Sequence, residues 1–139
     1  MAATGRRGYQ PAKDADGTIV DPLANYPAYV KAMEFYDRVA DDTDLMMRDP
    51  RARVIAVQMI ESAGSISANF EEGYGRTTTP EFIHRLRIAN GEARETRGWY
   101  HRARKFLPAP LVEQRLKEAD EVIALLVSTI KGLEARRSR

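Results

Sequence analysis

The sequence predicts an all-α fold, an antiparallel up-down four-helix bundle over residues 25–139 that follows a disordered, flexible N-terminal arm over residues 1–24. Three observations predict this fold. Apolar residues recur every three or four positions along four segments, which is the period of one helical face. Helix-start and helix-stop residues separate these segments. None of the segments alternates apolar and polar residues convincingly, as a half-buried strand does.

Length and composition limit the possible classes of protein. A chain of 139 residues suits one domain with a real core. The absence of cysteine excludes disulfides and thiolate chemistry and suits a reducing, cytoplasmic location. No apolar run approaches the 18 residues of a membrane span, and no apolar stretch of a secretory signal follows the first eight residues. The net charge of +2 does not by itself indicate a nucleic-acid partner.

The N-terminal arm lacks an apolar period. Residues 1–24 contain Gly5, Gly8, Pro11, Gly17 and Pro22 among scattered charges. Such a segment cannot bury one face against a core, so we expect a mobile tail.

Two helices are predicted before residue 76. The first begins at Tyr26 and ends near Asp49–Pro50, where Asp49 caps the second helix and Pro50 occupies its first turn. Gly73 and Gly75 are expected to end the second helix in a left-handed conformation. The two apolar stripes comprise Tyr29, Ala32, Met33, Tyr36, Val39 and Ala40 in the first helix and Ala52, Ile55, Ala56, Met59, Ile60, Ala63, Ile66 and Phe70 in the second.

The third helix begins after a threonine-rich break. Either Thr78 and Glu81 form a capping box, or Thr79 caps a helix whose first turn contains Pro80. The helix should run to Phe106–Leu107, where two prolines close it.

The fourth helix has the most regular apolar period. Its seam follows heptad spacing and comprises Val112, Leu116, Ala119, Ile123, Leu126, Ile130 and Leu133. Leu111, Val122, Leu125 and Val127 widen this stripe. The extra width indicates either self-association or contact with two neighbouring helices of the same bundle.

One motif resembles the signature of a known family. The pattern Ser-Ile-Pro-x-Asn-Ile-Ala-Glu-Gly, then Arg, Glu-Phe, Ala-x-Gly-Ser and a further Glu is matched by Ser65, Ile66, Asn69, Glu72, Gly73, Arg76, Glu81, Phe82, Ala89, Gly91 and Glu95. The departures are Ser67 for Pro, Phe70 for Ile, Glu71 for Ala and Glu92 for Ser. With this pattern the chain resembles bacterial four-helix bundle proteins encoded within intervening sequences of 23S rRNA genes.

The resemblance implies a fold and possible partners. Relatives include accessory proteins of diversity-generating retroelements, whose homopentameric barrel is thought to engage reverse transcriptase and RNA. By resemblance, we expect a homo-oligomer, with a pentamer as the first state to test, and RNA or a nucleic-acid enzyme as partner.

The polar residues of the motif have a structural interpretation. Asn69, Glu72 and Arg76 share one helical face beside Gly73, and Glu81 opens the next helix. We expect Arg76 to bridge Glu72 and Glu81, and Asn69 to bond a neighbouring backbone group. A catalytic carboxylate pair is the alternative, but nothing nearby supplies a nucleophile or a metal.

The predicted third helix is strongly basic. Residues 76–107 carry eight basic and three acidic residues, whereas residues 25–50 carry three basic and six acidic ones. Its candidate nucleic-acid-binding stripe comprises Arg87, Arg94, Arg97, His101, Arg104 and Lys105. The stripe could follow a phosphate backbone. Alternatively, it is a solvated face neutralised by acids of the first helix or of another subunit.

The same helix has an apolar arc on one side, which comprises Ile88, Ala89, Ala93, Trp99, Tyr100, Ala103, Phe106 and Leu107. Several polar and aromatic residues of this arc need a separate explanation. Arg85, Glu92 and Thr96 are polar, and we expect Arg85 and Glu92 to reach partners on other helices or the rim of the core. Trp99 and Tyr100 favour the core or a subunit interface over stacking on bases.

No enzymatic constellation is complete in the sequence. A di-iron bundle needs two Glu-x-x-His motifs, and only Glu81 and His84 form one. We therefore expect no metal, no cofactor and no catalytic residues. The resulting hypothesis is a non-enzymatic helical-bundle binding module with RNA or a nucleic-acid enzyme, such as a reverse transcriptase, as partner. The alternative is a purely structural homo-oligomer.

Overall fold

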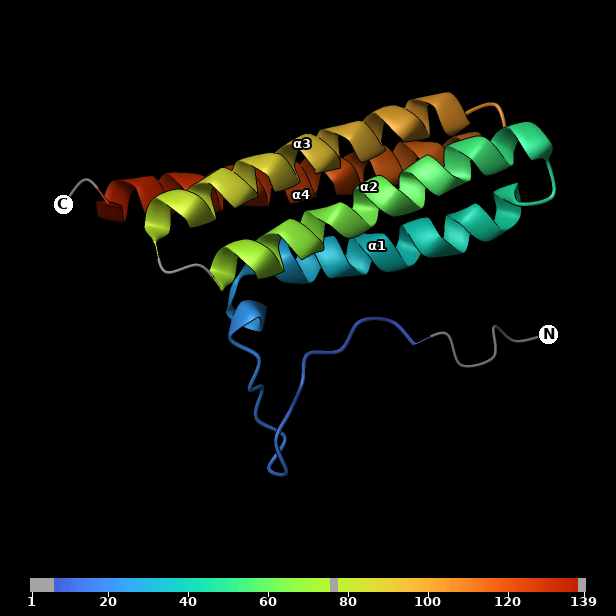
Figure 1. Cartoon of the computed structure of the whole chain (residues 1–139). Coiled ribbons are helices and arrows are strands. Elements are labelled where there is room, and N and C mark those ends of the chain that lie inside the picture. The colour runs from blue at the N-terminus through green and yellow to red at the C-terminus, as the bar shows by residue number, and fades with distance from the viewer. Residues whose placement is uncertain (1–6, 76–77, 138–139) are drawn as a thin grey trace.

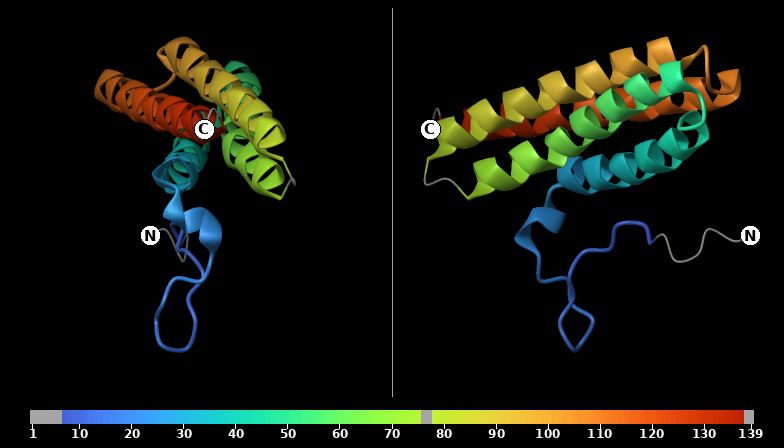
Figure 2. Two further views of the ribbon diagram at one scale, coloured as in Figure 1. Left: turned by 90° about the vertical axis from the view of Figure 1, so that its left-hand side faces the viewer. Right: turned by 45° about the vertical axis from the view of Figure 1, so that its right-hand side comes forward.

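The four predicted helices form one bundle. The computed structural model describes residues 7–75 and 78–137. Its helices are α1 (Pro27–Met46), α2 (Pro50–Tyr74), α3 (Thr79–Ala103) and α4 (Ala109–Arg137), preceded by a short 3-10 helix, η1 (Pro22–Asn25). Successive helices run in opposite directions (Figure 1), and α4 packs against α1 as well as α3, which closes the bundle. The end-on view in Figure 2 shows the four helices around a common interior.

The helix starts follow the local signals of the sequence. The Asp49 side chain caps α2 and accepts a hydrogen bond from the Arg51 backbone N–H at 2.9 Å. At the start of α3, Thr78 rather than Thr79 is the N-cap, and its hydroxyl accepts from the Glu81 N–H at 3.4 Å. Both caps satisfy backbone donors that the first turn of a helix leaves free.

The predicted glycine stop of α2 is wrong in its mechanism. The helix continues through Gly73 to Tyr74, and Gly75 has a right-handed conformation with φ of −73°. Gly73 is instead buried where α2 meets α3: a Cβ there would lie 2.8 Å from the Arg85 Cβ and 2.9 Å from the Phe82 Cδ1. Glycine at this position therefore permits close helix packing.

The predicted end of α3 is also wrong. The helix stops at Ala103, and the Ala103 carbonyl accepts from the backbone N–H groups of Phe106 and Leu107 at 2.8 and 3.0 Å. This turn places the Leu107 side chain in the core. Burial of Leu107 thus ends the regular helix before the prolines are reached.

The core contains most of the residues that the apolar periods predicted. Six of the seven seam residues of α4 are buried, and Leu116 packs partly buried against the core. Val122 is buried, while Leu111, Leu125 and Val127 are half-buried against the same core. The wide apolar stripe of α4 therefore packs against two neighbouring helices of the same bundle, α1 and α3. This is the second of the two interpretations that the sequence left open.

The N-terminal arm lies outside the bundle and still has local structure. Gly17, with a φ of +82°, forms a turn that brings Lys13 and Ile19 into an isolated antiparallel bridge. Tyr9 contacts Tyr29 edge to face at 6.0 Å, and its backbone N–H donates to Asp37 of α1 at 2.6 Å. The sequence pattern gave no sign of these contacts with the bundle.

Candidate nucleic-acid interface

The predicted cationic stripe lies along the outer side of α3. Arg87, Arg94, His101, Arg104 and Lys105 are exposed, and Arg97 is half-buried. The structure therefore leaves all six side chains at the surface, four of them on α3 and the other two, Arg104 and Lys105, in the turn directly after it.

Two arginines of the stripe are neutralised by α4. Arg97 donates through its Nε to Asp120 at 2.8 Å, and Arg87 forms an ion pair with Glu134. The acidic partners come from α4 of the same chain, whereas the sequence suggested the first helix or another subunit. That detail of the interpretation is wrong, because the antiparallel α3–α4 pair brings these side chains together.

The guanidinium and ammonium groups of Arg94, Arg104 and Lys105 keep their positive charge. Arg104 donates to the His101 carbonyl of its own helix at 2.7 Å, which fixes the guanidinium without neutralising it. The His101 ring lies 3.1 Å from the Arg97 guanidinium. Among the described residues, no acidic side chain pairs with Arg94, Arg104 or Lys105. Of these three residues, Arg94 is an exposed cation of α3, and Arg104 and Lys105 are exposed cations of the turn directly after it.

The family motif joins α2 to α3 through a different arginine from the one expected. Arg85 donates to the Glu72 carboxylate at 3.1 Å and to the Asn69 side-chain oxygen at 3.3 Å. Asn69 in turn donates to the Ser65 carbonyl at 2.8 Å, which confirms its predicted bond to neighbouring backbone. The predicted bridge through Arg76 lies outside the described residues.

The polar residues of the apolar arc behave differently from one another. Arg85 reaches α2, as predicted, and the buried Thr96 hydroxyl contacts the Ser62 hydroxyl of α2 at 2.8 Å. Glu92 is half-buried, and burial raises the pKa of its carboxyl. Tyr100 is fully buried, whereas half-buried Trp99 contacts the Arg102 guanidinium at 4.8 Å from its ring centroid. Neither aromatic residue is an open stacking platform.

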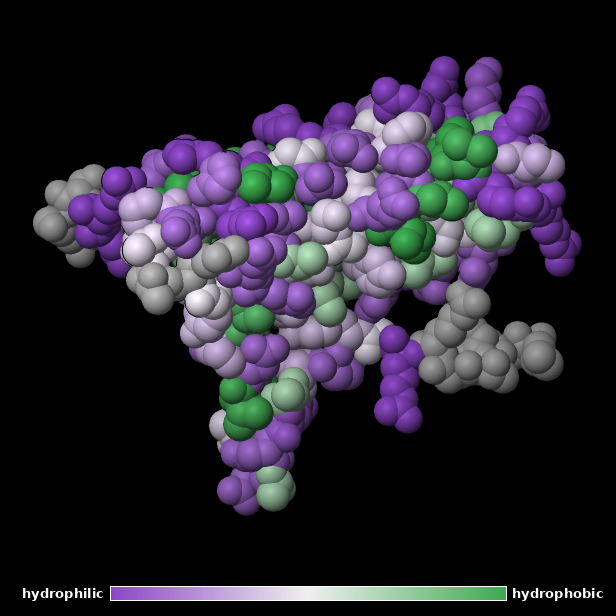
Figure 3. Space-filling view, viewed as in Figure 1, coloured by the Kyte–Doolittle hydropathy of each residue, from purple (hydrophilic) through white to green (hydrophobic). Residues whose placement is uncertain are grey.

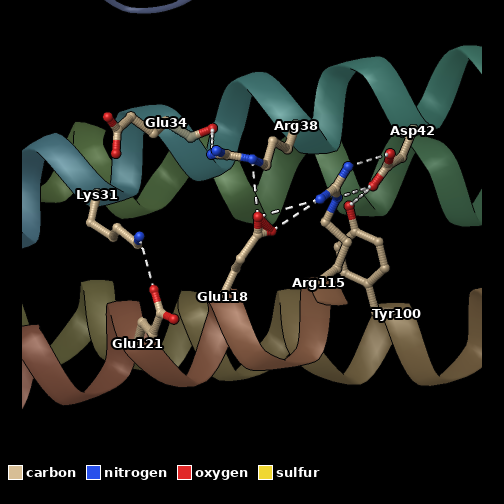
Figure 4. Close-up of polar contacts among 8 residues, drawn as sticks. All are labelled: Lys31, Glu34, Arg38, Asp42, Tyr100, Arg115, Glu118 and Glu121. Atoms are coloured by element: carbon tan, nitrogen blue, oxygen red, sulfur yellow. Dashed lines mark hydrogen bonds and ion pairs between the residues drawn. The ribbon is translucent and has the colours of Figure 1, made fainter. Parts of the chain in front are cut away.

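An ion network inside the bundle was missed by the sequence reasoning. Asp42 of α1 accepts from the Tyr100 hydroxyl at 2.6 Å and from two nitrogens of Arg115 at 2.7 and 3.2 Å (Figure 4). Arg115 also contacts the Glu118 carboxylate at 3.1 Å, and Arg38 pairs with Glu118 at 3.0 Å. The network joins α1, α3 and α4 and contains two positive and two negative groups.

The protonation states of the network follow from its geometry. Burial and the adjacent Asp42 carboxylate raise the pKa of the Tyr100 hydroxyl, so the phenol keeps its proton and donates. Burial disfavours the charged Arg115 guanidinium, but its bonds to Asp42 and Glu118 outweigh this and raise its pKa. Tyr100 and Arg115 therefore keep their protons in the folded protein, and both donate to the Asp42 carboxylate.

Apolar side chains come to the surface near the α1–α2 turn. Leu45, Met47, Val54 and Val57 are each more than 40% exposed. Met47 and Val57 line a hollow of about 380 Å³ between α1 and α2. In Figure 3, hydrophobic residues come to the surface in the right-hand half of the bundle, where α1 and α2 are joined, amid a mostly hydrophilic exterior.

The described part of the chain contains neither a metal-binding cluster nor a membrane-spanning helix. Residues 7–75 and 78–137 contain no group of three or more His, Asp or Glu residues arranged to hold a metal ion. Within the same residues, no helix is long and apolar enough to cross a membrane.

Comparisons with known proteins give one consistent result. The family model described as 23S rRNA-intervening sequence protein matches residues 24–128. A crystal structure of a protein of unknown function from the S23 ribosomal protein family of Bacteroides thetaiotaomicron is similar, with 27% sequence identity and a TM-score of 0.70. This similarity covers 75% of the present chain and 98% of that chain. No curated protein matches the chain.

Proposed function

The chain belongs to the 23S rRNA-intervening sequence protein family, and from this premise we propose that it is a non-enzymatic binding module that holds structured RNA against α3. The observation that carries the proposal is a set of exposed cations on α3 and in the turn directly after it: Arg94, Arg104 and Lys105. Arg94 lies in the last three turns of α3, and Arg104 and Lys105 follow in the turn directly after its last residue, Ala103. Arginine suits such a surface because its guanidinium makes bidentate contacts with phosphate oxygens.

A salt titration with defined variants tests the RNA proposal. Fluorescence anisotropy of a labelled RNA hairpin should show affinity falling steeply between about 50 and 200 mM salt, because phosphate contacts release counterions. Replacing Arg94, Arg104 and Lys105 together by Gln should weaken binding and reduce the salt slope by about three. The control replaces Arg7 and Lys13 by Gln, which removes two positive charges from the N-terminal arm, outside the bundle.

Two substitutions that should increase the affinity for RNA provide an independent test of the proposal. Asp120→Asn and Glu134→Gln release Arg97 and Arg87 from their ion pairs, so each substitution should strengthen binding and raise the salt slope by about one. Equal losses in the α3 variant and its control would indicate non-specific attraction and contradict the proposal. Absence of binding at low salt would also contradict it, and a protein partner such as a reverse transcriptase would then be the candidate to test.

We propose in addition that the chain self-associates through the apolar surface at the α1–α2 turn, with the pentamer implied by the resemblance as the first stoichiometry to test. Exposed Leu45, Val54 and Val57 favour an interface there, because large apolar side chains gathered on one surface are typical of interaction sites. Light scattering should give about five times the 15.7 kDa chain mass. Val54→Lys with Val57→Lys should reduce the mass, whereas Ile19→Lys with Val20→Lys, at equally exposed apolar positions of the arm, should not. A mass of one chain for the unaltered protein would contradict this proposal.

A further inference from the structure

A pocket lies at the end of the bundle where α2 turns into α3. It has a volume of about 360 Å³, within the range of small-ligand sites. Its lining includes three aromatic residues from three elements: Tyr26 before α1, Tyr74 at the end of α2 and Phe82 in α3. Tyr74 is 41% exposed, so part of its ring is accessible from solvent.

The three rings are held in a fixed mutual arrangement. Their centroids are 5.9–6.1 Å apart, and each pair meets edge to face at 73–87°. In such pairs the edge of one ring lies against the face of another, and Phe82 is buried, so Tyr74 is the ring of the triad that is most open to a stacked base. Further edge-to-face contacts of Phe70 with Tyr26 and Phe82 anchor the triad to the core.

Two unneutralised cations border the same pocket. Arg136 and Arg137, in the last turn of α4, belong to its lining, and among the described residues no acidic side chain pairs with either. An aromatic wall beside two guanidinium groups suits a nucleotide, because rings stack on a base and arginine binds phosphate. The aromatic wall distinguishes this ligand from a plain acidic peptide, which needs the charges alone.

The pocket adjoins the N-terminal end of the predicted cationic stripe. Arg137 also lines an adjoining hollow together with Ile83, Arg87 and Glu134. Arg87, the first residue of the α3 stripe, pairs with Glu134 in this hollow, so the start of the stripe and the pocket are linked through Arg137. A strand that follows α3 would thus reach the aromatic triad at the end of the helix.

We infer that this pocket binds one unpaired nucleotide at the end of an RNA strand held along α3, with the base against Tyr74 and its phosphate on Arg136 and Arg137. The inference rests on the proposed RNA-binding function. It narrows the partner to RNA that carries a single-stranded extension next to a duplex.

The test compares two RNA hairpins with the full chain. One hairpin ends bluntly, and the other has the same stem with a short single-stranded extension. Base stacking on an aromatic residue should make the extended hairpin bind about tenfold more tightly. Tyr74→Leu should remove this preference without changing affinity for the blunt hairpin, and Tyr74→Phe, which keeps the ring, should retain it.

A second variant does not depend on the aromatic packing. Arg136→Gln with Arg137→Gln alters only exposed side chains and should also reduce the preference for the extended hairpin. Equal affinity for both hairpins, with salt-dependent binding of the blunt one, would overturn the pocket inference and leave the α3 proposal intact. Tyr74-dependent binding of an acidic peptide without any preference for the extended hairpin would overturn it in favour of a protein partner. Failure of both hairpins to bind would refute the α3 proposal itself.

Discussion

Replacing Arg115 by Met should strongly destabilise the bundle. The Arg115 side chain is 13% exposed and carries the positive charge between the carboxylates of Asp42 and Glu118, whose side chains are 4% and 7% exposed. The Met side chain resembles the aliphatic part of Arg115 in length, but it is apolar throughout and has no hydrogen-bond donor. The substitution removes two hydrogen bonds from Asp42 and leaves this carboxylate with the Tyr100 hydroxyl alone.

The size of the destabilisation follows from what each carboxylate loses when Arg115 is replaced. Glu118 keeps its ion pair with Arg38, whereas Asp42 becomes an uncompensated buried charge. Removing one partner of a buried pair costs about 3–5 kcal/mol, a large part of the total stability of a domain. An exposed pair is worth well under 1 kcal/mol. Lys117→Met is therefore the matched control, because Lys117 lies two residues away and makes an exposed i,i+4 pair with Glu113 at 3.9 Å.

Urea unfolding at fixed protein concentration measures the effect. Arg115→Met should lower the midpoint by roughly 2 M for a chain of this size, and Lys117→Met should leave it nearly unchanged. Combining Asp42→Asn with Arg115→Met should cost about 1–3 kcal/mol less than the sum of the single variants, because the stranded charge is removed. Equal midpoints for Arg115→Met and Lys117→Met would refute the reasoning.

Two other predictions follow from the packing and titration of α2 and α3. Gly73→Ala should lower the free energy of unfolding by about 1–3 kcal/mol in urea, because its Cβ would lie 2.8 Å from the Arg85 Cβ. Gly91→Ala is the control, since nothing lies within 4 Å of its added Cβ, and an unchanged stability for Gly73→Ala would contradict the argument. Burial raises the pKa of Glu92, so the folded state binds its proton more tightly and loses stability as pH rises through that pKa. Glu92→Gln should raise Tm at neutral pH and lose this advantage below about pH 4; a constant difference across pH would contradict it.

Helix starts could be predicted because their causes are local in sequence. Asp49 and Thr78 bond backbone donors two and three residues ahead, so a short stretch contains the whole interaction. The end of α3 could not be predicted in this way. It depends on burial of Leu107 in a core that four separate helices build, and Gly73 likewise owes its role to the approach of a different helix.

The ion network depends on residues that are distant in sequence, yet a partial signal exists. Asp42 falls between Val39 and Met46 at the spacing of the buried stripe of α1, and Arg115 falls between Val112 and Ala119 in α4. A polar residue at such a position must find a buried partner. The sequence could therefore indicate that Asp42 and Arg115 need partners, but only the arrangement of the helices pairs them.

The same arrangement determines which charges of the bundle face a ligand. The internal network pairs two acids with two arginines, and Asp120 and Glu134 of α4 pair with two arginines of the stripe. These acids lower the net charge of the whole chain to +2 without neutralising Arg94, Arg104 and Lys105. Because exposed charges are screened beyond about 8–10 Å at ordinary salt, a phosphate on α3 responds to its nearest cations rather than to the total charge. A nearly neutral chain can thus have a surface suited to RNA, and substitutions at Asp120 or Glu134 should tune that surface.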